Sequence, residues 1–348
     1  MDDLTRSESS GGRDRSVEDG PIGSAAEHLP ADPHGLIAYA DALRAGQTRT
    51  LYTLNRAGSL HRIWPGVYQD LAAGRGNRPG AEAKALSYRR RVLAAARRLR
   101  DPVFTSWSAA ALLRLPIIGD WPEEVYVLSG SATGSRRGAI VRVATRSGAP
   151  EVRVDGVRVT SVEYTIIQLA RHARLGAALV AADAALRDMP FLGEPPLTTR
   201  TKLFEMHDQL RPYHRSRRAE AVLHRATHLS GSPLETVSRL AMEELGFAAP
   251  LLQVCIPLEG WADAYLDFYW DDDIGGESDG DSKYTAGDDS AETSARLLAE
   301  KAREDELRRR LKKLARWGWR DAWTGRPLER KLLRVGVPRV RPAVPRFW

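Results

Sequence analysis

The chain has 348 residues, of which 43% are hydrophobic and 28% are charged, with a mean hydropathy of −0.39. This length predicts two or three domains. Because no stretch approaches the ~18 consecutive apolar residues of a spanning helix, we expect no membrane-embedded segment.

The charge balance favours a polyanionic partner. The net charge of +7 and the pI of about 9.6 suit DNA, because Lys and Arg displace its condensed counterions. Residues 83–100 carry seven basic side chains and no acid, whereas residues 271–292 carry nine acids and one lysine. This separation is typical of a DNA-binding protein that uses a metal, although a solvated surface explains either run equally well.

The two ends and the single cysteine give further expectations. Residues 1–33 hold hardly any large apolar residue, so we expect them to be disordered, and they show no apolar core of a secretory signal. The only cysteine, Cys255, excludes intramolecular disulfides and suits a reducing cytoplasm. It lies in an apolar run and is predicted to be a buried strand residue. Residues 326–348 are basic and proline-rich, and we expect a flexible basic tail there.

Residues 34–75 have the element order of a winged helix-turn-helix. Two short helices are predicted, each ended by a glycine, and two β-prone segments follow around a Pro65-Gly66 turn. Such a fold lays its second helix in the major groove of DNA and its wing along the backbone. Four side chains are candidates for DNA contact: Arg49, Arg56, His61 and Arg62. The same fold also serves as a protein-docking module, so that alternative stays open.

Residues 81–230 predict a mixed α/β middle region without a catalytic constellation. Two helices come first, strands at 123–161 follow between Gly/Ser-rich turns, and four helices complete the region, the first two separated at Gly176. His224 and His228 have the i,i+4 spacing of helical metal ligands. No third ligand is apparent, so we interpret the pair as an ordinary helix face.

Residues 231–325 carry the pattern with the most chemical content. A helix begins at Ser232-Pro233, which are favourable N-cap and N1 residues. Two strands then flank an Asp-rich turn at 271–273, and a long helix is predicted over 295–319, with Glu306 and Arg310 paired at i,i+4. Three tryptophans at its end are interpreted as core residues and not as stacking platforms: Trp317, Trp319 and Trp323.

The acids of this region predict a metal site. Glu277 and Asp279 share one face of a strand because they are two residues apart, and Asp267 can lie beside them on the neighbouring strand. Three carboxylates on one face repel one another unless a cation neutralises them. Oxygen ligands of this kind favour Mg²⁺ or Mn²⁺.

Several segments in the same order carry a resemblance. The C-terminal SPLE, LDFYW, ESDGDSKY, EKAREDELRR and RWGWRDAW resemble an actinobacterial group whose domain is similar to very-short-patch-repair endonucleases of the PD-(D/E)xK superfamily. The front half, with GQTRTLYTLNRAGSLHRIWPGVYQ and SWSAAALLRLP, is similar to proteins with the winged helix of AbiEi-type antitoxins. The resemblance implies an α+β multidomain protein: a winged helix-turn-helix, a mixed α/β middle region and a restriction-endonuclease-like α/β domain.

The resemblance also implies roles for single residues. Asp267 and Glu277 correspond to the metal-binding acids, Glu235 is the acid of the preceding helix, and Asp279 takes the place of the superfamily lysine. Lys283 either holds the attacking water or phosphate or pairs with the acidic cluster. The expected activity is phosphodiester hydrolysis by a metal-activated water.

Two departures from that pattern keep a second hypothesis open. Ser278 stands where the group has a bulky apolar residue, which we expect to weaken the strand's grip on the core. The stretch 285–294 is polar and acidic and would repel phosphates. The sequence therefore predicts a cytoplasmic, Mg²⁺-dependent DNA endonuclease or nickase, or alternatively a non-catalytic DNA-binding regulator or AbiEi-type antitoxin, with a toxin protein as a possible partner.

Overall fold

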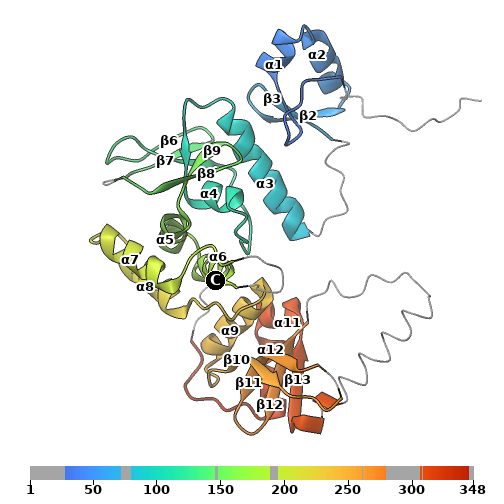
Figure 1. Cartoon of the computed structure of the whole chain (residues 1–348), viewed down its shortest axis with the longest axis vertical. Helices are drawn as coiled ribbons and strands as arrows, with labels where there is room; N and C mark the ends of the chain where they lie inside the picture. Colours follow the sequence, from blue (N-terminus) through green and yellow to red (C-terminus); the bar gives the residue numbers. More distant parts are fainter. Residues whose placement is uncertain are drawn as a thin grey trace, which may run out of the picture. The chain divides into compact units, whose positions relative to one another are not determined.

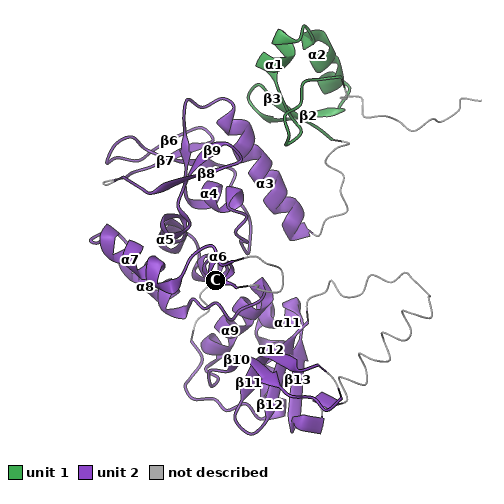
Figure 2. Ribbon diagram, viewed as in Figure 1, with its two compact units in different colours: residues 1–77 green, residues 78–348 purple. Residues whose placement is uncertain are grey.

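The computed structural model describes residues 28–71, 80–145, 148–188, 195–260, 262–279, 306–307 and 309–344. The chain divides into two compact units, residues 1–77 and residues 78–348 (Figure 2). Both combine helices with sheets, so the chain is an α+β protein. No described helix combines the length and the apolar character that crossing a bilayer requires.

The first unit is a small three-stranded sheet with two helices. Its elements are β1 (Leu36–Ala38), α1 (Tyr39–Arg44), α2 (Thr48–Arg56), β2 (Leu60–Trp64) and β3 (Val67–Asp70). The strands are antiparallel in the order β1-β3-β2. Gly46 and Gly58 end the helices with φ of +71° and +75°, a left-handed conformation that glycine adopts without steric cost. The predicted helix–turn–helix–hairpin order is therefore confirmed, and β1 is an addition to it.

The expectation of disorder up to residue 33 is wrong at its end. Residues 1–27 lie outside the described residues, but Leu29 is buried in the core of the first unit and Ala31 forms a bridge with Ile37. The physical reason is that Leu29 is a large apolar residue among polar neighbours, and burying it stabilises the sheet edge.

The second unit begins with a six-stranded mixed sheet. Its strands are β4 (Val103–Phe104), β5 (Val125–Leu128), β6 (Ser135–Arg137), β7 (Ile140–Val143), β8 (Glu151–Val154) and β9 (Val157–Thr160), in the order β6-β7-β5-β4-β9-β8. Two helices accompany it, α3 (Gly80–Ala96) and α4 (Ser106–Leu112). The buried Tyr88 ties α3 to the sheet, because its hydroxyl donates to the carbonyl oxygen of Glu124 at 2.7 Å.

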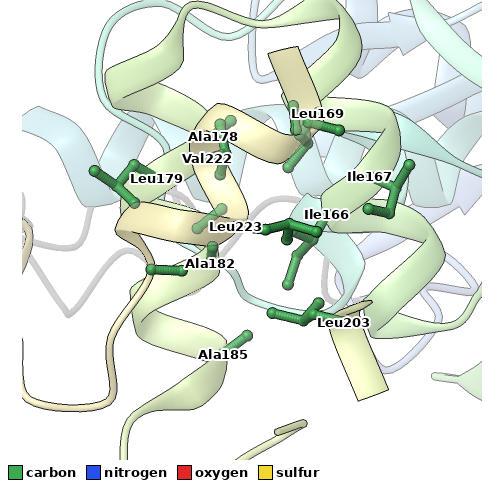
Figure 3. Packing of buried hydrophobic residues seen from close by; sticks show 14 of the residues in the cluster. Ile166, Ile167, Leu169, Ala178, Leu179, Ala182, Ala185, Leu203, Val222 and Leu223 are labelled. Carbon is green, nitrogen blue, oxygen red and sulfur yellow. The ribbon is translucent and has the colours of Figure 1, made fainter. Parts of the chain in front are cut away.

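Four helices form the largest core of this unit. They are α5 (Val162–His172), α6 (Leu175–Leu186), α7 (Arg200–Leu210) and α8 (Ser216–Arg225). Figure 3 shows the side chains of Ile166, Leu179 and Leu223 among those that fill the space between these helices. The break predicted at Gly176 falls at Ala173–Arg174 instead, and Gly176 lies buried inside α6.

The C-terminal part of the second unit packs helices on a four-stranded sheet (Figure 1). Its elements are α9 (Pro233–Leu245), β10 (Leu251–Ile256), β11 (Ala264–Trp270), β12 (Ile274–Ser278), β13 (Lys313–Trp317), α11 (Trp319–Thr324) and α12 (Arg326–Val335). The strand order is β10-β11-β12-β13, antiparallel except for the parallel pair β12–β13. Phe268, Trp270 and Trp317 form its core together with apolar residues of the three helices.

A buried carboxylate joins this part to the four-helix core. Asp183 of α6 is 1% exposed and accepts hydrogen bonds from the backbone N–H of Thr227 (2.8 Å), the hydroxyl of Thr236 (2.7 Å) and the guanidinium of Arg239 (2.6 Å). Thr236 and Arg239 belong to α9. Because a buried charge needs several partners, this junction fixes α9 against α6.

Two predictions at the C-terminus are wrong. Residues 313–317, predicted as the end of a long helix, are strand β13, because pairing with β12 places Ala315 and Trp317 in the core. Residues 326–348, expected as a flexible tail, begin with helix α12. The strap that follows, up to residue 344, donates hydrogen bonds from the N–H groups of Val340 and Val344 to the C-terminal end of α9.

The tryptophan interpretation holds only in part. Trp317 is 2% exposed, and its indole N–H donates to the hydroxyl of Ser238 at 2.8 Å. Trp323 is 38% exposed and stacks on Trp319 with ring centroids 5.9 Å apart. Trp317 is thus a core residue, and Trp323 is not.

Candidate active site

The first turn of α9 holds Glu235 in a buried position. The Ser232 hydroxyl accepts from the Glu235 backbone N–H at 3.2 Å and so caps the helix, as predicted for this residue. The Glu235 carboxylate accepts from the N–H of Gly231 at 2.7 Å. The guanidinium of Arg187 in turn donates to the Gly231 carbonyl, so the residue that positions Glu235 is itself held by the end of α6.

Gln253 of β10 connects Glu235 to the sheet. Its side-chain amide nitrogen donates to Oε2 of Glu235 at 3.1 Å and lies 3.3 Å from Oδ1 of Asp267. Its backbone φ is +51°, a left-handed conformation that is uncommon for residues other than Gly, Asn and Asp and that persists where the surrounding structure fixes the backbone. One amide group thus binds two acids from different elements.

The regular alternation of side chains along strand β11 is interrupted at Asp267. Gly275 and Gly276 point to opposite sides of β12; a Cβ on Gly275 would meet Leu266, and one on Gly276 would meet Trp270. Leu266 and Trp270 are four residues apart on β11 and would share a face in a regular strand. The pleat therefore breaks between them, at Asp267 and opposite Gln253.

Asp267 is held on its other oxygen by Ser278. Both the backbone N–H and the hydroxyl of Ser278 donate to Oδ2, at 2.9 Å and 2.8 Å. With Gln253 on Oδ1, the carboxylate is bonded on both oxygens. The sequence predicted that Ser278 weakens the packing of the core. In the structure Ser278 instead donates hydrogen bonds to Asp267.

Glu277 is paired with an arginine from the next strand. In the parallel register Glu277 lies opposite Arg316, and Nη2 of Arg316 is 2.6 Å from Oε2 of Glu277. Asp279 follows, exposed at the end of the strand, where its N–H donates to the carbonyl of Trp317 at 2.9 Å. The C-terminal ends of β12 and β13 thus carry two acids and one arginine.

The acids influence one another electrostatically. Burial raises the pKa of Glu235, and the charge of Asp267 raises it further. Burial likewise raises the pKa of Glu277; Arg316 opposes this rise, while Asp279 and Asp267 add to it. Because each acid disfavours the charge of its neighbour, Glu235, Asp267, Glu277 and Asp279 form one coupled cluster, which we call the carboxylate site.

The ligand set predicted for a metal is not assembled in the described residues. No group of three or more His, Cys, Asp or Glu side chains there is arranged to hold a metal ion; the oxygens of Asp267 and Glu277 instead contact Gln253, Ser278 and Arg316. The donor chemistry nevertheless fits Mg²⁺ or Mn²⁺, because carboxylate oxygens are hard ligands and a divalent cation would offset the burial and neighbouring charge that raise the pKa of Glu235 and Glu277. Lys283 lies outside the described residues.

The candidate DNA contacts of the first unit are all exposed. Arg49 and Arg56 lie on α2, and His61 and Arg62 lie on β2. Leu51, also on α2, points into the core. α2 therefore has a buried side and a side on which basic residues reach solvent.

Other candidate residues take ordinary positions. Cys255 is exposed, which contradicts the predicted buried residue, because β10 is an edge strand of the sheet; its thiol lies 3.6 Å from a carboxylate oxygen of Asp263. The ring of His224 packs edge-on against Phe204 at 5.3 Å.

A scan of the chain against known family models finds no match, and a search of curated proteins finds no significant relative.

Three functional candidates escaped sequence reasoning: Gln253, Ser278 and Arg316. Gln253 lies in the same apolar run as Cys255, and a single polar residue at the centre of a predicted strand can indicate a functional position. No feature of the sequence indicated a functional role for Arg316, because its segment was predicted as helix. Only the parallel pairing of β13 with β12 brings it to Glu277.

Proposed function

We propose that this protein is a metal-dependent DNA endonuclease or nickase whose reaction takes place at the carboxylate site. Asp267 and Glu277 hold a divalent cation, with Asp279 at its edge. Glu235 orients the metal or its water from the first turn of α9. The substrate is the phosphodiester backbone of DNA.

One observation carries the proposal. Glu235 from a helix and Asp267 from a strand, far apart in sequence, meet at the Gln253 amide, where the pleat breaks. A purely structural sheet gains nothing from burying Glu235 and Glu277, because desolvation disfavours the charged form of each and the charge of Asp267 adds to that penalty. Backbone strain at such a cluster is a feature of functional sites.

The chain's own groups supply positioning and charge control. Mg²⁺, when bound, would activate a water and neutralise charge on the phosphate. Gln253 and Ser278 fix both oxygens of Asp267, and Arg316 fixes Glu277 and offers a guanidinium, which suits phosphate oxygens. Arg316 thereby provides a positive charge at the end of the strand, whereas Asp279, which takes the place of the superfamily lysine, provides none.

The first unit is proposed to recruit the substrate. Its helix–turn–helix–hairpin order and the exposed Arg49, Arg56, His61 and Arg62 suit α2 in a major groove with the β2–β3 hairpin along the backbone. Basic side chains on an exposed helix face gain affinity from phosphate contacts.

A second candidate function is a DNA-binding regulator without catalysis, of the antitoxin type. Its support is that no described group of three acids is ready to hold a metal. The contacts of Asp267 and Glu277 with Gln253, Ser278 and Arg316 would then be structural. Such a protein binds DNA through its first unit and needs no divalent cation.

Incubation with supercoiled plasmid separates the two. The endonuclease predicts nicked or linear product with Mg²⁺ or Mn²⁺, abolished by EDTA and by Asp267→Asn. The regulator predicts no product from any DNA substrate while duplex binding persists. Calorimetric titration with Mn²⁺ adds a second readout: binding that Asp267→Asn removes supports the carboxylate site independently of turnover.

A further inference from the structure

Helix α12 has one buried face and one arginine face. The buried face consists of three apolar residues of the C-terminal core: Leu328, Leu332 and Val335. Arg326, Arg330 and Arg334 follow one another at four-residue steps, so they line a single stripe on the opposite side of the helix. All three are exposed, and within the described ranges none makes a hydrogen bond or an ion pair.

The charge pattern of this stripe is not that of an ordinary solvated face. Like charges at i,i+4 destabilise a helix, whereas opposite charges stabilise it. Elsewhere the chain uses the favourable arrangement, as in Glu306 and Arg310, whose side chains meet at 3.2 Å. On α12 the nearby Glu329 is ion-paired with Arg339 of the strap and so does not neutralise the stripe. The stripe thus contains two repelling pairs in succession, and within the described residues no side chain forms an ion pair with it.

Helix α12 is bonded to strand β13, which borders the carboxylate site. Nζ of Lys331 donates to the carbonyl of Arg316 at 2.8 Å and to the carboxylate of Asp321 at 2.7 Å. Arg316 is the residue that pairs with Glu277. The helix that displays the stripe is therefore bonded to the strand residue that positions a proposed metal ligand.

We propose that Arg326, Arg330 and Arg334 bind the sugar-phosphate backbone of DNA, on the same unit that contains the carboxylate site. The three residues span about 12 Å of helix axis, which corresponds to roughly three to four nucleotide steps of one strand. Guanidinium groups bind phosphate oxygens through charge-assisted, often bidentate hydrogen bonds. This deepens the proposed function by adding a second DNA contact, on the unit that contains the acids.

The test is the salt dependence of DNA binding by the full chain. Fluorescence anisotropy with a labelled 25-base-pair duplex is measured in EDTA at several KCl concentrations, for wild type and for R326Q/R330Q/R334Q. Losing three phosphate contacts is expected to lower the slope of log K against log [salt] by about 2 to 3 and to weaken binding at low salt roughly tenfold or more. The melting temperature is expected to be unchanged or higher, because like-charge repulsion is removed.

A matched control removes the same charge elsewhere on the second unit. Arg137, Arg174 and Arg217 are also exposed and, within the described part of the chain, likewise lack ion pairs. R137Q/R174Q/R217Q is expected to keep the wild-type slope to within about one unit. An equal loss in both triple variants shows a general charge effect and overturns the proposal, as does a wild-type slope in the stripe variant.

The outcome is independent of turnover. If the stripe variant has a reduced salt slope but wild type never cuts plasmid, the proposal that the stripe binds DNA is supported and the proposal of DNA hydrolysis is wrong. If wild type cuts and the stripe variant binds and cuts DNA normally, the proposal that the stripe binds DNA is wrong and the proposal of DNA hydrolysis is supported. Vesicles with 30% phosphatidylglycerol serve as the competing surface: stripe-dependent binding to them, with unchanged DNA binding, overturns the assignment to DNA.

Discussion

Ser278 donates two hydrogen bonds to one oxygen of Asp267, from its backbone N–H at 2.9 Å and from its hydroxyl at 2.8 Å. A bulky apolar residue at position 278 would keep only the first of these. The core beside it is filled differently, since the indole of Trp317 and the ring of Trp270 lie against the bare Cα of Gly276. The serine is thus part of the carboxylate site and not a packing defect.

Ser278→Ala should lower the free energy of unfolding by about 1 to 2 kcal/mol, because it removes a hydrogen bond to a charged group that is partly buried. Urea denaturation at pH 7 in EDTA measures this. Ser278→Thr retains the hydroxyl and is the control, expected to lose less than half as much. Equal losses in the two variants would show that side-chain volume matters there and the hydroxyl does not.

Gln253→Gly should be more stable than Gln253→Ala by about 1 kcal/mol, because the φ of +51° suits glycine and strains alanine. Both variants lose the amide contacts to the acids, so the difference isolates the backbone. The matched pair is at Tyr265 of β11, 60% exposed and without a positive φ, where alanine should be the better residue. Urea midpoints of the four variants are compared, and a preference for alanine at position 253 contradicts the strained backbone.

The contribution of Glu235 and Glu277 to stability should fall as pH rises through the carboxyl range. The pKa values of Glu235 and Glu277 are raised above their ordinary value of 4.5, in both cases chiefly by burial. The folded state therefore binds more protons than the unfolded state just above pH 4.5, and the free energy of unfolding decreases across that window. Glu235→Gln should weaken this pH dependence and match or exceed wild-type stability at pH 7. Thermal melts of both proteins from pH 4 to 7.5 in EDTA provide the comparison. The prediction is wrong if the stability of the variant relative to wild type is lower at pH 7 than at pH 4.

Asp267→Ala and Glu277→Ala should each reduce Mg²⁺-dependent cleavage by roughly 100-fold or more, while leaving metal-free DNA affinity within about twofold of wild type. The acids are proposed to hold the metal, and the affinity for DNA comes from basic residues elsewhere. Glu235→Ala should be milder, since a residue that orients the metal or its water contributes less than a direct ligand. Plasmid nicking and duplex anisotropy are measured on the same preparations. Retention of full cleavage in the Asp267 variant would remove that residue from the reaction.

R49Q/R56Q/R62Q in the first unit should weaken duplex binding about tenfold at low salt and reduce the salt slope by up to about 3. These side chains are exposed on α2 and β2, so the variant should melt at the wild-type temperature. Wild-type DNA affinity in this variant would favour the protein-docking alternative for the first unit. R137Q/R174Q/R217Q again serves as the control for charge alone.

Local patterns in the sequence were sufficient for much of this protein. The N-cap Ser232, the helix-ending Gly46 and Gly58, and the turn at 271–273 each act within a few residues of the chain, so their structures follow from local chemistry. The same holds for β11 and β12 and for the presence of acids in and beside them. These features place Asp267, Glu277 and Asp279 in one hairpin.

The tertiary structure alone decided how those acids are held. The KLARW segment of β13 suits helix or strand, and pairing with β12 selected the strand and brought Arg316 to Glu277. The burial of Glu235 depends on the packing of α9 against α6 and the sheet, which is a long-range contact. Helix α12 forms for the same reason, because its apolar face is stabilised by burial against a core that no local pattern contains.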